Sequence, residues 1–181
     1  LIKSEPHTEH ALWQLIGIYQ QEKDWDKAIE IAHRLEAVSG KRHATLIAQY
    51  YCEMAESARR KGEWATAMKL IRRALSTDRN CARASIIEGD MQLLANEPKL
   101  AIRAYRRVEQ QDPDFVSETV QPLIDCYGRL GRPDEMIAYL QRILARHGGT
   151  TIMLALAELE RQGRGEEAAV AFITRYLTSH P

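Results

Sequence analysis

This sequence repeats itself about every 34 residues. Ala67 and Ala101, which are 34 positions apart (101 − 67), each begin an apolar pattern that continues one, four and seven residues later. Residues at these intervals share one face of an α-helix. A single helical hairpin cannot bury its apolar face alone, so its copies are expected to stack on one another. The spacing therefore predicts an all-α protein built from repeated helical hairpins.

The pattern continues on both sides of this pair. The equivalent position before the pair is Ala28, 39 residues ahead of Ala67. The equivalent positions after it are Met136, 35 residues beyond Ala101, and Ala169, 33 residues beyond Met136. Each aligned segment is the second helix of its repeat unit, and helix-breaking and acidic residues that favour a helix start precede it. The first part of each unit also has apolar residues at the helical period. We expect about ten helices in five antiparallel pairs, which form one right-handed superhelical array over residues 1–181. The predicted units are 9–42, 48–81, 82–115, 117–150 and 150–181.

Two features disturb the regular pattern. Pro122 falls inside the first helix of the fourth unit, where a proline costs about 3 kcal/mol. Either that helix starts late, near Pro122, or it is kinked. The junction 37–46 holds five extra residues, because 39 exceeds the period by that number. We expect the junction to widen or bend the stack between the first two units.

Composition excludes several classes of protein. The chain has 25 acidic and 25 basic side chains, so no bulk attraction to nucleic acid or anionic lipid is expected. No apolar run reaches the length of a membrane span, and no signal-peptide pattern is visible. The three isolated cysteines fit a reducing compartment and are expected to be small core residues. Because the sequence begins with Leu1, we expect it to be part of a longer protein.

No catalytic motif is present. The sequence has no H-E-x-x-H, P-loop or G-x-S-x-G pattern, so we expect neither an enzyme nor a cofactor site. His7 and His10 have the spacing of a metal pair, but we interpret them as solvated histidines. Trp25 and Trp64 precede the second helices and are expected to wedge between helices. Trp13 lies off the apolar face of its helix and is a candidate partner contact.

The first helices of such an array line its concave face. The residues there that lie off the packing face are Trp13, Gln20, Gln49, Glu56, Arg59, Arg83, Asp90, Glu118, Gln121, Asp125 and Arg129. Mixed charge of this kind suits a protein or peptide partner better than a uniform polyanion, although a groove that is simply solvated is the alternative. An arginine stripe on the second helices, formed by Arg72, Arg73, Arg103, Arg106, Arg107 and Arg142, lacks the interleaved aromatic residues that single strands need. We interpret it as a solvated outer wall and expect no nucleic-acid partner.

The helix-turn-helix unit resembles the tetratricopeptide repeat. The third unit has Gly89, Ala101, Tyr105 and Pro113 at the positions where that repeat has Gly, Ala, an aromatic residue and Pro. Gly89 and Ala101 would let two helices approach closely. No unit is complete, and the first and fifth diverge most.

Longer stretches are similar to the repeat region of the bacterial lipopolysaccharide assembly protein B family. They are 18–35, 82–120 and 168–181. That family has an N-terminal membrane anchor and a C-terminal rubredoxin-like domain, whose two C-x-x-C pairs bind metal. Zinc or iron is therefore expected only in a domain outside this sequence. Cys52, Cys81 and Cys126 do not match that motif.

The resemblance also implies a function. It implies an adaptor on the cytoplasmic side of the inner membrane of Gram-negative bacteria, with a soluble repeat region. The adaptor brings the deacetylase of the lipid A pathway to a membrane-bound AAA+ protease and answers to an inner-membrane sensor protein. It would thereby regulate lipopolysaccharide synthesis through proteolysis.

Two other readings stay open from the residues alone. One is a generic peptide-binding tetratricopeptide co-chaperone, which holds a terminal carboxylate in a basic clamp. The acids Glu56, Asp90, Glu118 and Asp125 on the first helices count against a clamp. The other is a structural scaffold for cell-envelope assembly.

Overall fold

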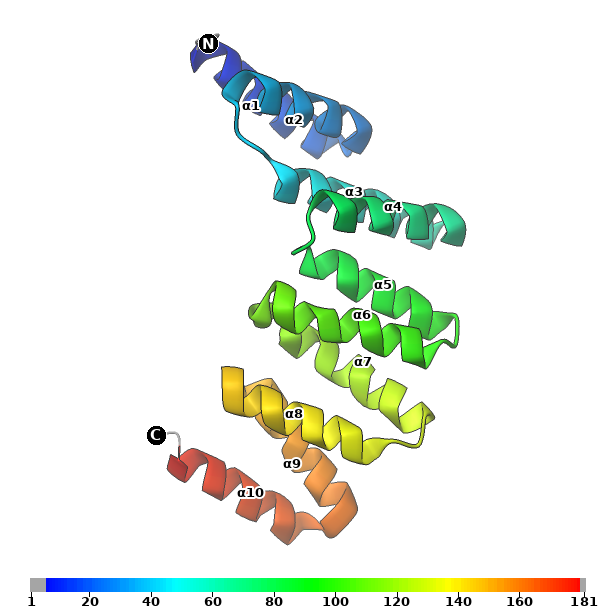
Figure 1. Cartoon of the computed structure of the whole chain (residues 1–181), viewed down its shortest axis with the longest axis vertical. Helices are drawn as coiled ribbons and strands as arrows, with labels where there is room; N and C mark the ends of the chain where they lie inside the picture. The colour runs from blue at the N-terminus through cyan, green and yellow to red at the C-terminus, as the bar shows by residue number, and fades with distance from the viewer. Residues whose placement is uncertain (1–5, 180–181) are drawn as a thin grey trace. The chain divides into compact units, whose positions relative to one another are not determined.

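The computed structural model describes residues 6–179, and this part of the chain is all-α, as the sequence predicts. Ten α-helices and one short 3-10 helix follow one another (Figure 1). The α-helices are α1 (Pro6–Glu22), α2 (Trp25–Ser39), α3 (Ala44–Arg60), α4 (Trp64–Thr77), α5 (Ala82–Leu94), α6 (Pro98–Gln111), α7 (Val116–Arg129), α8 (Pro133–His147), α9 (Thr150–Arg164) and α10 (Glu166–Ser179). The 3-10 helix η1 is Pro113–Phe115. None of these helices is long and apolar enough to cross a bilayer.

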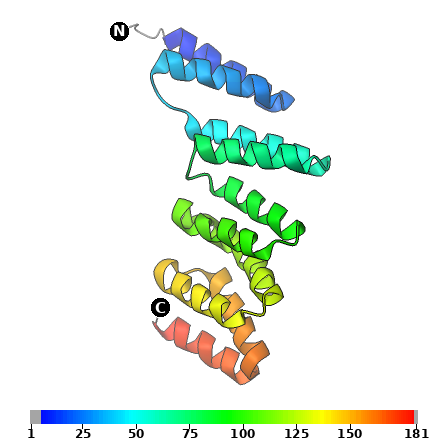
Figure 2. The ribbon, with the colours of Figure 1, turned by 45° about the vertical axis from the view of Figure 1, so that its right-hand side comes forward.

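Consecutive helices form hairpins. α1 packs on α2, α3 on α4 and α9 on α10, and both views show these pairs side by side (Figures 1 and 2). The tight turns inside four hairpins pass through a left-handed residue two positions before the second helix begins, at Lys23, Gly62, Asn96 and Gly131. This conformation reverses the chain within a few residues, so the two helices of a hairpin lie antiparallel.

The predicted helix starts are confirmed. Pro98 and Pro133 are the first residues of α6 and α8, where a proline loses no needed hydrogen bond. Asp24 caps α2 by accepting a hydrogen bond from the backbone N–H of Lys27 at 3.3 Å. These starts set the register in which each second helix presents its apolar face.

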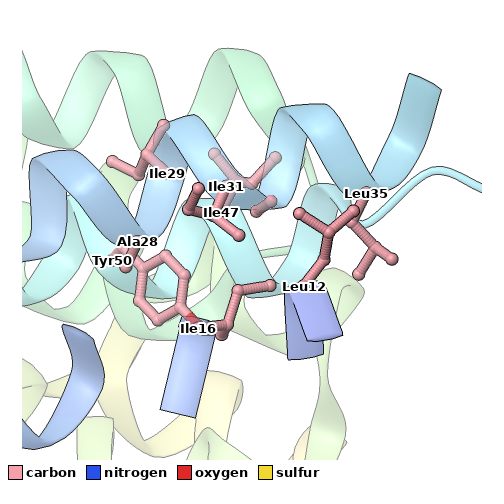
Figure 3. Close-up of a cluster of buried hydrophobic side chains, with 9 residues drawn as sticks. Leu12, Ile16, Ala28, Ile29, Ile31, Leu35, Ile47 and Tyr50 are labelled. Carbon is pink, nitrogen blue, oxygen red and sulfur yellow. The ribbon is translucent and has the colours of Figure 1, made fainter. Parts of the chain in front are cut away.

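The chain divides into two compact units, the first ending at Glu88 and the second beginning at Gly89, within α5. In the first unit, α1, α2 and α3 enclose an apolar core (Figure 3). Its buried side chains are Leu12, Ile16, Ala28, Ile29, Ile31, Ala32, Leu35, Ile47 and Tyr50. Trp25 at the start of α2 stacks on Tyr50 of α3, with ring centroids 5.7 Å apart, so the predicted wedge is confirmed at this position.

In the second unit, Tyr105 fixes α6 against α5. Its ring is fully buried and lies against Gly89, where an added Cβ would come within 2.7 Å of the ring atom Cζ. Its hydroxyl donates a hydrogen bond to Asp90 at 2.7 Å. Burial and this bond raise the pKa of Tyr105, so the hydroxyl stays a donor. Gly89 and Ala101, which is also fully buried, therefore occupy close helix–helix contacts, as the repeat pattern predicts.

The cysteines are core residues, as predicted. Cys52, Cys81 and Cys126 are all buried, and the sulfurs of Cys52 and Cys81 lie 3.7 Å apart as free thiols. Burial raises the pKa of the Cys126 thiol to about 11, because a thiolate is poorly solvated in the protein interior.

We therefore expect Cys126 to react slowly in the folded protein. A pKa near 11 makes its thiolate about 100-fold scarcer at pH 8 than that of a cysteine with a pKa near 9. Iodoacetamide labelling followed by peptide mass spectrometry should find Cys126 unmodified in buffer and labelled in urea. Equal labelling rates in the two conditions would contradict the buried position.

α7 begins at Val116 and runs through Pro122, which excludes the late start and leaves the kinked helix as the remaining prediction. The structure corrects two other expectations. The five extra residues do not lengthen a loop: α3 has 17 residues against 13 in α5, and α2 has 15 against 14 in α4. Trp64 does not wedge between helices, because it is 48% exposed at the start of α4.

Candidate protein-binding surface

The predicted binding residues, called here the first-helix surface, include a cross-helix contact in the first unit. Arg83 of α5 reaches α3, where its Nη1 donates to Glu53 Oε1 at 2.6 Å and lies 3.5 Å from Gln49 Oε1. Although burial disfavours the charge of Arg83, the bond to Glu53 raises its pKa. Arg83 and Gln49, two of the predicted binding residues, therefore lie side by side, a contact that the sequence analysis did not predict. Glu53, which the sequence analysis missed, is the residue that neutralises Arg83.

Other charged members of the first-helix surface also have partners. Arg59 bonds Glu56 one turn earlier on α3, with its Nη2 2.8 Å from Oε2. Arg129 pairs with Asp125 on α7 at 2.9 Å and reaches Asn96, and the bond to Asp125 raises its pKa. Asp90 accepts the bond from Tyr105 and therefore supports the fold directly.

The remaining members are open to solvent. Gln20, Glu118 and Gln121 are exposed, and the last two lie on α7. Trp13 is 44% exposed and sits edge-on to His43, with ring centroids 5.2 Å apart. These side chains can meet a partner without first breaking an internal ion pair, so they are the strongest members of the predicted site.

Several polar contacts join residues about one repeat apart. The pairs are Thr45 with Asp78, Gln49 with Arg83, Asn96 with Arg129, and Glu109 with Arg142, separated by 33 or 34 positions. Equivalent positions of neighbouring hairpins therefore face one another. An alignment of the repeats would have indicated these pairs, because each joins residues about one repeat length apart. The sequence analysis did not use this spacing.

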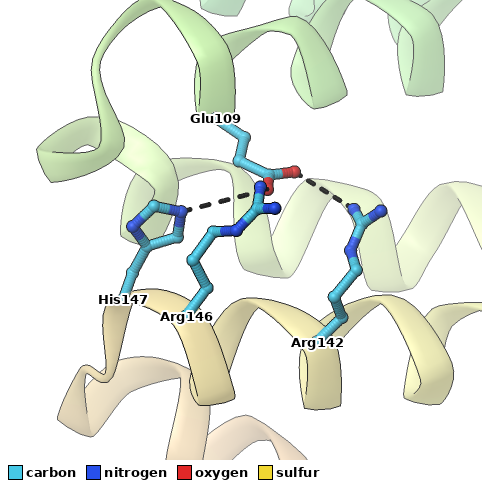
Figure 4. A network of polar contacts seen from close by, with 4 residues as sticks. All are labelled: Glu109, Arg142, Arg146 and His147. Atoms are coloured by element: carbon cyan, nitrogen blue, oxygen red, sulfur yellow. Dashed lines mark hydrogen bonds and ion pairs between the residues drawn. The ribbon is translucent and has the colours of Figure 1, made fainter.

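Glu109 is the centre of a cationic network in the second unit (Figure 4). Its side chain is only 8% exposed and comes from α6. Arg142 and Arg146 of α8 each donate to one of its carboxylate oxygens at 3.1 Å, and His147 Nε2 lies 3.9 Å away. A buried carboxylate needs such partners, so the network ties α6 to α8.

Tyr139 of α8 supports the same cluster. The guanidinium groups of Arg106 and Arg142 lie 5.0 and 5.2 Å from its ring centroid. Burial raises the pKa of Tyr139 to about 12, so the ring stays neutral and offers its electron-rich face to the cations. Arg106 and Arg142 of the arginine stripe are exposed, as the interpretation of a solvated outer wall expects, and they also contact the ring of Tyr139, which that interpretation did not include.

Within residues 6–179, no group of three or more His, Cys, Asp or Glu side chains could hold a metal ion. His7 and His10 lie exposed on α1.

Repeated helical hairpins with small residues at their close contacts define the class of this protein. The tetratricopeptide repeat family matches residues 52–114 and 124–181, and the chain belongs to that family.

The chain is also similar to lipopolysaccharide assembly protein B, as the sequence predicted. It is 37% identical to that protein of Escherichia coli strain K12 over 171 residues, which cover 94% of this chain and 44% of the relative. The protein of the same name from Haemophilus influenzae is 32% identical and is matched over 100% of this chain and 46% of its own length. This chain therefore spans about half the length of these relatives.

Solved structures share the fold. A structure of Pseudomonas aeruginosa PilF matches with a TM-score of 0.55, over 97% of this chain and 78% of that chain. The two sequences are 17% identical, so the likeness concerns the fold alone.

Proposed function

We propose that this chain is the protein-binding part of an adaptor that regulates lipopolysaccharide synthesis. The adaptor presents the deacetylase of the lipid A pathway to a membrane-bound AAA+ protease on the cytoplasmic side of the inner membrane, and an inner-membrane sensor protein controls it. The observation that carries this proposal is the similarity to lipopolysaccharide assembly protein B across 94% of the chain. Binding without catalysis is what such a role requires of a repeat array.

The surface chemistry favours a folded partner over a terminal carboxylate. A carboxylate clamp needs basic side chains that are free to receive the ligand. On the first-helix surface, Arg59, Arg83 and Arg129 already pair with Glu56, Glu53 and Asp125. Each of these three arginines is therefore compensated one to one by an acid of the chain, which leaves no excess of positive charge for a ligand carboxylate. The co-chaperone alternative is therefore the weaker one.

The exposed face of α7 offers the sharpest test of deacetylase binding. The double variant Glu118→Arg with Gln121→Arg changes the net charge by +3 at two exposed side chains of α7. We expect it to weaken deacetylase binding about tenfold or more, because like or mismatched charges at an interface cost affinity. Isothermal titration calorimetry of the purified chain with the deacetylase measures the change.

A matched control lies on a second helix. Glu30→Arg with Ala37→Arg on α2 adds the same three charges at exposed positions. It should bind like the unmodified chain, and both variants should melt as that chain does. Equal losses in the two variants, or a loss only in the α2 variant, would remove α7 from the binding surface.

A further inference from the structure

The Glu109 network forms one side of a strongly basic pocket in the second unit. The pocket has a volume of about 410 Å³, and its charged lining consists of Arg103, Arg106, Arg107, Arg142, Arg146 and Glu109. All six residues come from the second helices α6 and α8. The pocket therefore belongs to a different set of helices from the first-helix surface.

The positive charge exceeds what the fold needs. Besides Arg107, four guanidinium groups face the carboxylate of Glu109, so the positive charge of these four residues exceeds its negative charge by three. Arg142 and Arg146 are 51% and 65% exposed, and each donates an N–H bond to Glu109. A guanidinium carries five N–H donors. Donors thus remain for an incoming acid.

The arginines are also held in position. The ring of Tyr139 supports Arg106 and Arg142. Glu109 holds Arg142 and Arg146 (Figure 4). Ordering a long side chain before binding lowers the entropy that binding costs. Arginine forks match carboxylates in a bidentate geometry, which a lysine cannot provide.

The surroundings indicate which anion fits. Tyr139 is only 5% exposed, so no aromatic face is open for a nucleic-acid base to stack on. Small-molecule pockets are mostly apolar, whereas this pocket is lined by charged side chains. A row of exposed guanidinium groups on two helices instead complements a row of carboxylates on an extended chain.

We propose that the α6–α8 pocket binds an acidic, Asp- or Glu-rich segment of a partner protein. The segment's carboxylates pair with Arg103, Arg106 and the outer donors of Arg142 and Arg146. This extends the proposed adaptor function, because an adaptor must hold a second protein on a surface separate from the first. The test of the α6–α8 pocket does not use the deacetylase, so the pocket proposal and the deacetylase proposal can each fail while the other holds.

The probe is a fluorescently labelled peptide of alternating Glu and Gly, with the Gln and Gly peptide as its neutral counterpart. Fluorescence anisotropy should show binding of the acidic peptide only, weakening as salt is added. Arg103→Gln with Arg106→Gln should lower the affinity about tenfold, because it removes two guanidinium groups and leaves the partners of Glu109 in place. The control Arg72→Gln with Arg73→Gln removes two arginines from α4, which does not line the pocket, and should have little effect.

A second variant should change affinity in the opposite direction. Glu109→Gln removes the acid that competes for Arg142 and Arg146, so we expect binding of the acidic peptide to tighten about threefold or more. A purely structural network would give no such gain. Unchanged or weaker binding by a folded Glu109→Gln variant would overturn the proposal. So would an equal loss in the α4 control, or tighter binding of inorganic pyrophosphate or a single-stranded oligonucleotide than of the peptide.

Discussion

Ala101→Glu is expected to lower the free energy of unfolding by about 4 kcal/mol. Ala101 is fully buried on α6, at the position where four of the five repeats have alanine and the fourth repeat has Met136. A glutamate there has to bury its carboxylate without a partner or force the helices apart. Urea denaturation followed by circular dichroism measures the loss.

The control for this substitution is Lys99→Glu on the same helix. Lys99 is exposed, and substitutions at such positions usually change stability by about 0.5 kcal/mol or less. Both variants add a glutamate to α6 within two residues of one another, so helix propensity and position are nearly matched. Equal shifts in the urea midpoint would show that the register of α6 is wrong.

Gly89→Ala is expected to cost about 2 kcal/mol, although alanine is the better helix former. An added Cβ would lie 2.6 Å from Cδ1 of Tyr105. The ring cannot turn away freely, because it is fully buried and its hydroxyl is bonded to Asp90. α5 and α6 would therefore have to separate.

Gly128→Ala on α7 makes the same chemical change without that clash. No atom lies within 4 Å of the Cβ that would be added there. We expect this variant to be neutral or more stable by about 0.5 kcal/mol. The melting temperature should fall for Gly89→Ala and stay unchanged or rise slightly for Gly128→Ala, and a matching loss in both would contradict the contact between Gly89 and Tyr105.

The sequence predicted the helices well because the apolar period repeats in every unit. Ala67 and Ala101 are both fully buried, so the apolar pattern that begins at these two residues predicted the buried faces of α4 and α6 correctly. The local rule for Pro122 was less informative. Val120 and Leu123 on either side of it are buried, and this packing offsets the cost of a proline inside α7.

The charges on the surfaces were harder to predict. The sequence analysis placed residues on faces of single helices, but whether a charge is free depends on the neighbouring helix. Arg83 finds Glu53 on α3, 30 positions away, and Arg142 finds Glu109 on α6. Local periodicity carries no information about such partners. The eleven residues of the first-helix surface stay a prediction, with Glu118 and Gln121 as its most accessible charged and polar members.

The adaptor role is tested most directly by asking whether two partners are held at once. The chain, within the protein that carries it, would be mixed with the deacetylase and the detergent-solubilised AAA+ protease and passed through size-exclusion chromatography with light scattering. The account predicts one species that contains all three proteins, and its loss when Glu118→Arg with Gln121→Arg is used. Separate elution of the deacetylase in the presence of the adaptor and protease, or binding of the two partners that is mutually exclusive, would contradict it.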